Sequence, residues 1–159
     1  MNEMAARIND ELLDYQTLRL KDLIAQMIEC CEDRKLYETR RFGLPYAELK
    51  CLMLFIGERY LTVKGIAGKL DVAKSRVTKL VDGLVRKGFL KRISDPKDGR
   101  IKLISVSPDG EQISRRIEAF HKDIHRQILI QMDDDERKRM LSYLETLRSA
   151  MEAVKERLV

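Results

Sequence analysis

The sequence lacks the features of several protein classes. No run of eighteen apolar residues occurs among the 159 residues, so no membrane-spanning helix is expected. The first ten residues mix acidic and basic side chains without an apolar core, which argues against a secretory signal. There are only three cysteines, Cys30, Cys31 and Cys51, an odd number without the spacing of a disulfide framework. These absences predict a protein of the reducing cytoplasm.

The signatures of enzymes are also missing. The chain has two histidines and contains no glycine-rich phosphate loop, no G-x-S-x-G and no H-E-x-x-H. Because side-chain catalysis needs a nucleophile, a base and an orienting group in one pocket, no enzymatic activity is expected. No cofactor is expected to be required either.

Positive charge is concentrated in one part of the chain. The whole sequence carries a net charge of +5. Between Thr62 and Val106, twelve Lys and Arg stand against four Asp, a net charge of +8, whereas the remaining residues together carry −3. A segment that faces phosphate groups has this kind of distribution, so the middle segment is expected to contact nucleic acid.

Hydrophobic spacing predicts long helices at both ends of the chain. Residues 6–38 carry an apolar stripe without Pro or Gly, and a second helix is expected from Pro45 to Gly57. Ser107 and Pro108 are expected to open a long helix, and the Asp133–Asp135 run to start the last one. The second helix has a predicted core face of Leu49, Leu52, Met53 and Ile56. The last helix has apolar residues alternately four and three apart, as in coiled coils: Met140, Leu144, Leu147, Met151, Val154 and Leu158.

Residues 62–87 have the spacing of a helix-turn-helix motif. Thr62 is a good N-cap for a short helix that ends at Leu70, and Ala67 is small where that helix crosses the next. Asp71 stands where the turn needs a positive φ, a conformation that favours Gly but that Asp tolerates. The next helix, from about Ala73 to Lys87, has apolar residues at offsets 0, 3, 4, 7 and 8: Val77, Leu80, Val81, Leu84 and Val85. An ordinary helical hairpin is the alternative interpretation.

The side chains opposite this apolar face are basic or hydroxylated. They lie at the N-terminal end of the helix, which enters the major groove in helix-turn-helix proteins. Strands are expected at Phe89–Ser94 and Arg100–Val106, joined by a turn that presents Lys97 and Arg100 to a minor groove or to phosphates. A solvated basic face is the alternative. The predicted DNA contacts are Thr62, Lys74, Ser75, Arg76, Thr78, Lys79, Lys97 and Arg100.

Two stretches resemble the MarR-type regulators, the multiple antibiotic resistance regulators that include the SlyA group. They are VAKSRVTKLVDGLVRKGFLKR, residues 72–92, and SDPKDGRIKLISVSPDG, residues 94–110, and the similarity covers nearly the whole chain. The resemblance implies a winged helix-turn-helix, with a recognition helix in the major groove and a wing in the minor groove. In that family an acid and an arginine pair to brace the wing, a role that matches Asp98 and Arg100, with Asp95 beside them. Asp71 departs from the family, which mostly has Gly there.

The resemblance also implies an obligate homodimer with intertwined first and last helices. The apolar stripes of those helices support this expectation, because a free monomer would expose them. A two-fold dimer would also place two recognition helices about one DNA turn apart. We therefore expect residues 1–41 and 107–159 to form a helical dimerisation region and residues 42–106 to form the DNA-binding region.

The resulting prediction is a mostly α protein with a small β-hairpin wing, a sequence-specific regulator of double-stranded DNA. We expect a ligand-responsive repressor on a palindromic operator, since no polymerase-contact module is visible. The resemblance implies that a small aromatic or lipophilic acid binds as effector, with Tyr15, Arg19, Met53 and Phe120 as candidate pocket residues. Met53 and Phe120 are equally compatible with a plain core position.

Other sensing modes stay open. His121 and His125 are four residues apart, a spacing that can bind zinc, although they supply only two of four ligands. Cys30 and Cys31 diverge by about 100° on a helix, which makes a bridge between them difficult. Metal- or oxidant-responsive regulation on the same fold is therefore an alternative. A winged helix that binds protein instead of DNA is another, but it would not need the +8 segment.

Overall fold

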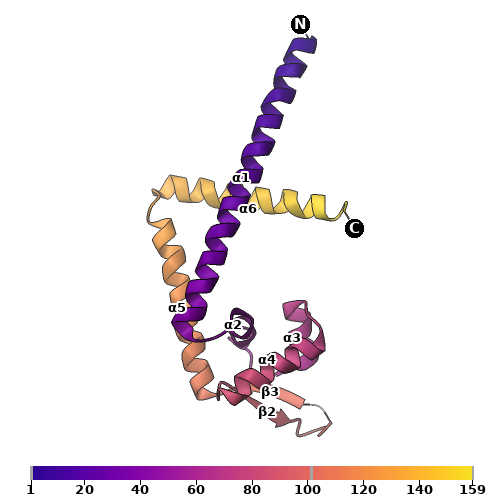
Figure 1. The fold of residues 1–159 in the computed structure, drawn as a ribbon, viewed down its shortest axis with the longest axis vertical. Coiled ribbons are helices and arrows are strands. Elements are labelled where there is room, and N and C mark those ends of the chain that lie inside the picture. Colours follow the sequence, from indigo (N-terminus) through magenta and orange to yellow (C-terminus); the bar gives the residue numbers. More distant parts are fainter. Residues whose placement is uncertain (1, 101, 159) are drawn as a thin grey trace. The chain divides into compact units, whose positions relative to one another are not determined.

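The computed structural model describes residues 2–100 and 102–158. Its elements, drawn in Figure 1, confirm the predicted class of a mostly helical protein with a small β wing. In chain order they are α1 (Asn2–Phe42), α2 (Tyr46–Met53), β1 (Leu61–Thr62), α3 (Val63–Leu70), α4 (Lys74–Arg86), β2 (Leu90–Ser94), β3 (Lys102–Val106), α5 (Pro108–Leu129) and α6 (Asp134–Lys155). Among the described residues, no helix combines the length and the apolar character that crossing a bilayer requires.

The chain divides into two compact units, residues 1–114 and residues 115–159. The first unit holds α1 to β3 and the first turns of α5. The second holds the rest of α5 and all of α6. The predicted division into a dimerisation region and a DNA-binding region concerns the assembled protein, so it stays a prediction.

The core of the first unit lies between α2, α3, α4 and the sheet. α2 and α3 both pack on α4, which places α4 at the centre of the unit. Full burial of each large apolar side chain contributes roughly 1.5–3 kcal/mol, so this cluster is the main source of stability. Its fully buried members include Leu44, Leu49, Leu52, Ile66, Val77, Val81, Leu84, Leu90 and Ile104.

The wing is part of a three-stranded antiparallel sheet with strand order β1-β3-β2. Leu90 of β2 stands opposite Val106, and Leu61 of β1 stands opposite Ile104. The sequence predicted only the two-stranded hairpin, with strands that begin one or two residues earlier than observed. The missed strand has only two residues, too few for a local pattern to reveal.

Two helix boundaries differ from expectation. α1 continues to Phe42 because no breaker precedes Gly43, which adopts a φ of 63°. α2 ends at Met53, before Gly57, so helical spacing no longer applies beyond it. The prediction that Ile56 belongs to the core is wrong, since it is 40% exposed.

The start of α6 follows the predicted signal. Asp133 accepts a hydrogen bond from the backbone N–H of Glu136 at 2.8 Å, and the Glu136 side chain accepts one from the Asp133 N–H at 2.9 Å. This reciprocal capping box satisfies two donors that a helix start otherwise leaves without partners. The aspartate run therefore starts the last helix, as expected.

Candidate nucleic-acid interface

The turn between α3 and α4 has helix-turn-helix geometry. Asp71 follows the last residue of α3 in the left-handed region, with φ 54° and ψ 52°. It is the only non-glycine residue with a positive φ among the described residues. The Val72 N–H then donates to the carbonyl of Ala67 at 3.2 Å, which closes the end of α3. Aspartate therefore makes the turn that usually requires glycine.

α3 begins at a side-chain cap. Thr62 Oγ1 accepts a hydrogen bond from the backbone N–H of Gly65 at 3.0 Å, so Thr62 caps the helix as predicted. Thr62 is half-buried and pairs with Leu103 in the sheet. The cap uses a lone pair of the hydroxyl oxygen and leaves the hydroxyl proton available for donation. The contact with DNA predicted for this residue stays a prediction.

The two faces of α4 differ in chemistry. Val77, Val81 and Leu84 are fully buried, and the opposite side carries the basic and hydroxyl side chains. The Thr78 hydroxyl donates to the carbonyl of Lys74 at 3.0 Å, which leaves its lone pairs to accept hydrogen bonds. The exposed side chains of this face are Lys74, Ser75, Arg76, Thr78 and Lys79.

The N-terminus of α4 has no side-chain cap. Its N-cap residue, Ala73, has no side-chain acceptor, and its carbonyl accepts from the Arg76 N–H at 3.0 Å, so the N–H groups of Lys74 and Ser75 are the ones that a cap would have bound. The concave surface in front of this turn has a volume of about 590 Å³ and is lined by Lys64, Ala67, Gly68, Asp71, Val72, Ala73 and Lys74. This end of α4 is therefore electropositive and accessible to an anion.

The wing turn is closed by its own polar side chains. Asp95 Oδ1 accepts from the Lys97 N–H at 2.8 Å, and Asp98 Oδ1 accepts from the N–H and the Nε of Arg100 at 3.0 and 3.2 Å. Lys102 Nζ donates to Ser94 Oγ and to the Gly99 carbonyl, a clamp that the sequence did not indicate. The Arg100 side chain is 92% exposed and Lys97 is exposed, so the turn presents two cations to solvent.

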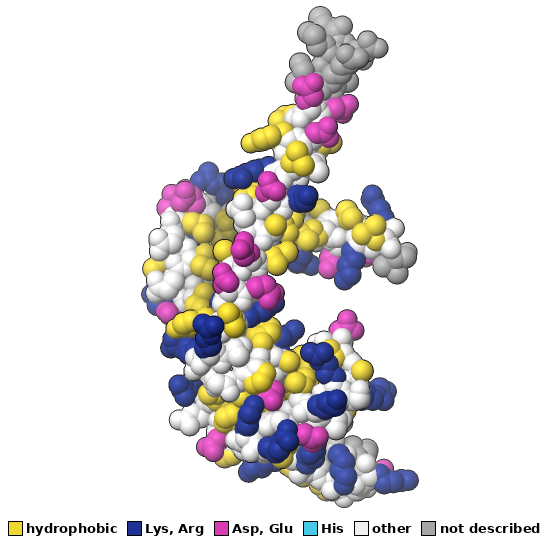
Figure 2. Space-filling view, in the orientation of Figure 1, with side chains coloured by type: hydrophobic (Ala, Val, Ile, Leu, Met, Phe, Trp, Pro, Cys, Tyr) yellow, Lys and Arg dark blue, Asp and Glu magenta, His cyan; other side chains and the backbone are white. Residues whose placement is uncertain are grey.

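An ion pair joins the wing to α4. Arg92 of β2 donates to Asp82 of α4, and both side chains are partly exposed. The sequence analysis did not single out either residue. On the face drawn in Figure 2, Lys and Arg side chains gather over the part of the molecule that holds α3, α4 and the hairpin. The +8 segment therefore forms a cationic surface in the folded first unit.

Comparisons with known proteins agree with this geometry. Residues 42–101 match the model of the MarR family. The HTH-type transcriptional regulator YfiV of Bacillus subtilis is 23% identical over 150 residues, which cover 94% of this chain and 93% of that protein. The chain is therefore similar to MarR-type transcriptional regulators, and the family match covers residues 42–101. The matched relative is named as a transcriptional regulator and not as an enzyme.

Solved structures share the fold of this chain. A MarR family protein from Bacillus stearothermophilus has a TM-score of 0.74 at 21% identity, covering 87% of this chain and 97% of that one. Streptococcus pneumoniae FabT, solved in complex with DNA, has a TM-score of 0.72 at 20% identity, covering 84% of this chain and 98% of that one. The winged helix-turn-helix assignment is thus confirmed.

The predicted effector residues lie on three helices. Tyr15 and Arg19 are exposed on α1, and Met53 is half-buried at the end of α2. Phe120 is half-buried in the α5 residues of the second unit. Their role in effector binding stays a prediction.

The candidate metal and redox residues have different surroundings. His121 is half-buried and His125 is exposed. No group of three or more His, Cys, Asp or Glu within the described parts of the chain is arranged to hold a metal ion. Cys30 and Cys31 are exposed on α1, whereas Cys51 is buried in α2. Burial, and secondarily the nearby charge of Glu48, raises the pKa of the Cys51 thiol to about 11. Cys51 is therefore protonated at neutral pH and shielded from reagents while α2 stays packed.

Proposed function

We propose that this protein is a homodimeric MarR-type repressor that binds double-stranded DNA sequence-specifically at a palindromic operator and responds to a small ligand. The observation that carries the proposal is the exposed N-terminal end of α4. There, Lys74, Ser75, Arg76, Thr78 and Lys79 face solvent beyond a helix-turn-helix turn, while the opposite face is buried.

In this proposal each group of side chains has its own role. Arg76 pairs with a guanine edge in the major groove, and Ser75 donates to a base or a phosphate. Thr78, whose hydroxyl proton is donated to the Lys74 carbonyl, accepts from a base amino group. Lys74, Lys79 and the uncapped N–H groups of α4 bind backbone phosphates. Lys97 and Arg100 reach the adjacent minor groove or its phosphates, while Asp95 and Asp98 brace the turn. FabT, which has a similar fold, was solved in complex with DNA, and this supports DNA binding by the same fold here.

Binding to the upstream region of its own gene should depend steeply on salt. With about 6–10 phosphate contacts, affinity should fall by roughly 10³–10⁵ between 50 and 200 mM salt, because each contact releases counterions. Fluorescence anisotropy with a labelled duplex measures this slope. A small aromatic or lipophilic carboxylic acid, added in the same assay, should weaken the complex. Salt-insensitive binding would instead favour a winged helix that contacts protein.

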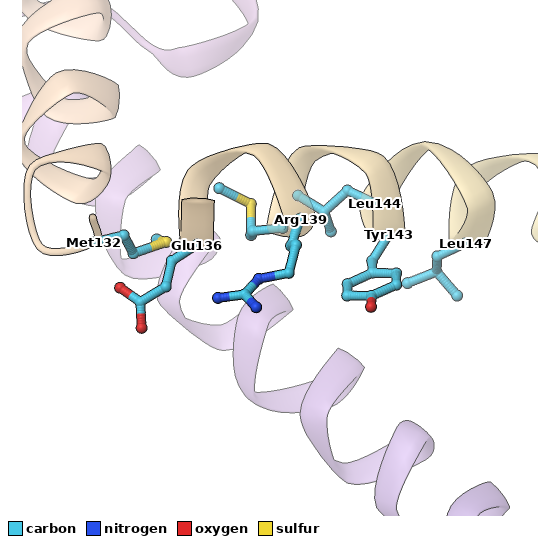
Figure 3. A pocket seen from close by; sticks show the side chains of 7 residues that line it. Met132, Glu136, Arg139, Tyr143, Leu144 and Leu147 are labelled. Carbon is cyan, nitrogen blue, oxygen red and sulfur yellow. The ribbon is translucent and has the colours of Figure 1, made fainter. Parts of the chain in front are cut away.

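We propose the homodimer because apolar faces of the helices are exposed to solvent in the single chain. Leu144, Met151 and Val154 of α6 are 46%, 52% and 54% exposed, and they lie on the predicted coiled-coil-like stripe. Figure 3 shows side chains following one another along the start of α6 beside a concavity of about 440 Å³. That concavity is lined by Met132, Glu136, Arg139, Met140, Tyr143, Leu144 and Leu147. Because MarR-type proteins are dimers, a second copy of this chain is the occupant we propose.

A chain truncated after Asp134 should lose dimerisation, since it lacks all but the first residue of α6. Light scattering at fixed protein concentration should give the monomer mass, where the full chain gives the dimer mass. Leu147→Glu is expected to have the same effect without removing the helix, because it places a charge on the apolar stripe. Ser149→Glu, on the opposite face of α6, is the matched control and should stay dimeric. A dimeric Leu147→Glu variant would show that this stripe is not the interface.

A further inference from the structure

A carboxylate from α2 is seated against the middle of α4. A Cβ added to Gly83 would overlap Glu48 Oε1 and would lie 3.3 Å from Glu48 Cδ. The other carboxylate oxygen, Oε2, accepts a hydrogen bond from Lys87 Nζ at the C-cap of α4. The Glu48 side chain is only 13% exposed and Gly83 is buried. The absent side chain of Gly83 thus makes a notch that the carboxylate fills.

We propose that Glu48 is a positioning residue for DNA recognition, holding α4 at one rotation and one register on α2. The proposal rests on the DNA binding proposed above. Glu48 touches no base or phosphate in it. It acts through α4, which carries Lys74, Arg76 and Lys79 at its other end.

The apolar contacts of α4 do not by themselves fix its rotation about the helix axis. Val77, Val81 and Leu84 are held by hydrophobic attraction, which is non-directional and depends on the area removed from water. A charge-assisted hydrogen bond is directional and short, so it selects one orientation among similar packings. Functional side chains must be held within about 0.5 Å and 10–20° to act, and a small rotation of α4 moves all of its groove-facing residues together.

The placement of the two charges favours their pairing. Glu48 lies in the first turn of α2, where the helix dipole stabilises an anion, and Lys87 follows the last turn of α4, where it stabilises a cation. The low exposure of Glu48 reduces screening by solvent. This contact also explains why position 83 is a glycine. Alanine is the better former of a helix interior, but its methyl group would occupy the space of the carboxylate.

A double-mutant cycle tests the notch. Gly83→Ala should lower affinity for the operator about tenfold, within the roughly 2- to 150-fold range of couplings between contacting residues. Affinity for an unrelated duplex should not change, because phosphate contacts do not need the exact rotation of α4. In the Glu48→Ala background, Gly83→Ala should cause no further loss, since the space is then vacant. Fluorescence anisotropy with both duplexes gives the four pairs of affinities.

A second cycle tests the charge. Glu48→Gln and Lys87→Gln should each lower the ratio of operator to unrelated-duplex affinity, and the double variant should be no worse than either single one. Glu58→Gln is the matched control. Glu58 pairs with Lys69 of α3 at 3.2 Å in the same unit without using α4, so the ratio should stay as in the unmodified protein.

A readout without DNA separates this inference from the proposed function. In a Cys30→Ser, Cys31→Ser background, the labelling rate of buried Cys51 by a thiol reagent reports how closely α2 packs on α4. With Glu48 present, Gly83→Ala should raise the labelling rate of Cys51. In the Glu48→Ala background, Gly83→Ala should leave that rate unchanged. Additive effects in both assays, or an equal loss of specific and non-specific affinity alongside a lower Tm, would overturn the proposal. Coupled labelling rates in a protein without operator binding would instead reject the DNA-binding function.

Discussion

Arg76→Ala is expected to abolish specific operator binding and to leave the homodimer intact. Arg76 is exposed in the first turn of α4, and its guanidinium makes no hydrogen bond or ion pair within the described residues. A bidentate Arg–guanine contact contributes about 1–3 kcal/mol to discrimination, and a two-fold dimer makes it twice. Operator affinity should therefore fall on the order of 10²-fold or more. An anisotropy titration at fixed salt measures this loss, and light scattering measures the mass.

Two further variants separate base reading from charge. Arg76→Lys keeps the cation but not the planar pair of donors, so it should retain the salt slope and lose operator preference. Arg40→Ala removes an exposed arginine from α1 and should bind the operator like the unmodified protein. Loss of the dimer together with DNA binding in Arg76→Ala would mean that Arg76 has a structural role, and our assignment of its face would be wrong.

The helix-turn-helix could be predicted because its signals are local. The apolar spacing of α4 placed Val77, Val81 and Leu84 on one face, and all three are fully buried. Asp71 stood where the turn needed a positive φ, and it adopts a φ of 54°. In both cases residues a few positions apart determine the structure, so a single sequence contains the necessary information.

The contacts that orient α4 could not be predicted in this way. Glu48 meets Lys87 across 39 positions, and β1 pairs with a strand about forty residues later. Nothing in the neighbourhood of Glu48 indicates which helix it will face. Gly83 was the one available signal, because a glycine inside an amphipathic helix pattern requires a packing reason. The buried notch beneath Glu48 is that reason.

The boundary errors have a similar origin. Ile56 was placed in the core by extending helical spacing past Met53, where α2 stops. The exposed stripes of α1 and α6 were predicted as apolar faces, but the sequence gives no local indication of what covers them. In the proposed homodimer a second copy of the chain covers these faces, so the residues around each stripe do not specify its partner.

Gly110→Ala is expected to destabilise the protein strongly. Gly110 is buried in the first turn of α5. An added Cβ would overlap the carbonyl oxygen of Phe89, and would lie 2.9 Å from Phe89 C and 2.7 Å from Val106 Cγ2. The Phe89 carbonyl is held in place because it accepts from the Ser107 N–H at 2.9 Å. Since the obstacle is backbone, no side-chain rotation relieves it, and one of the two segments must move.

The expected loss is about 3 kcal/mol in the free energy of unfolding, the upper end of the usual cost of overpacking. For a chain of this size that corresponds to a Tm lower by about 6–12 °C, measured by circular dichroism at fixed protein concentration. Gly68→Ala is the matched control, because Gly68 lies in α3 with no atom within 4 Å of an added Cβ. It should be neutral or more stable by about 0.5–1 kcal/mol, since alanine favours the helix. If both variants melted at the same temperature, the close contact between the start of α5 and the residue before β2 would not exist in solution.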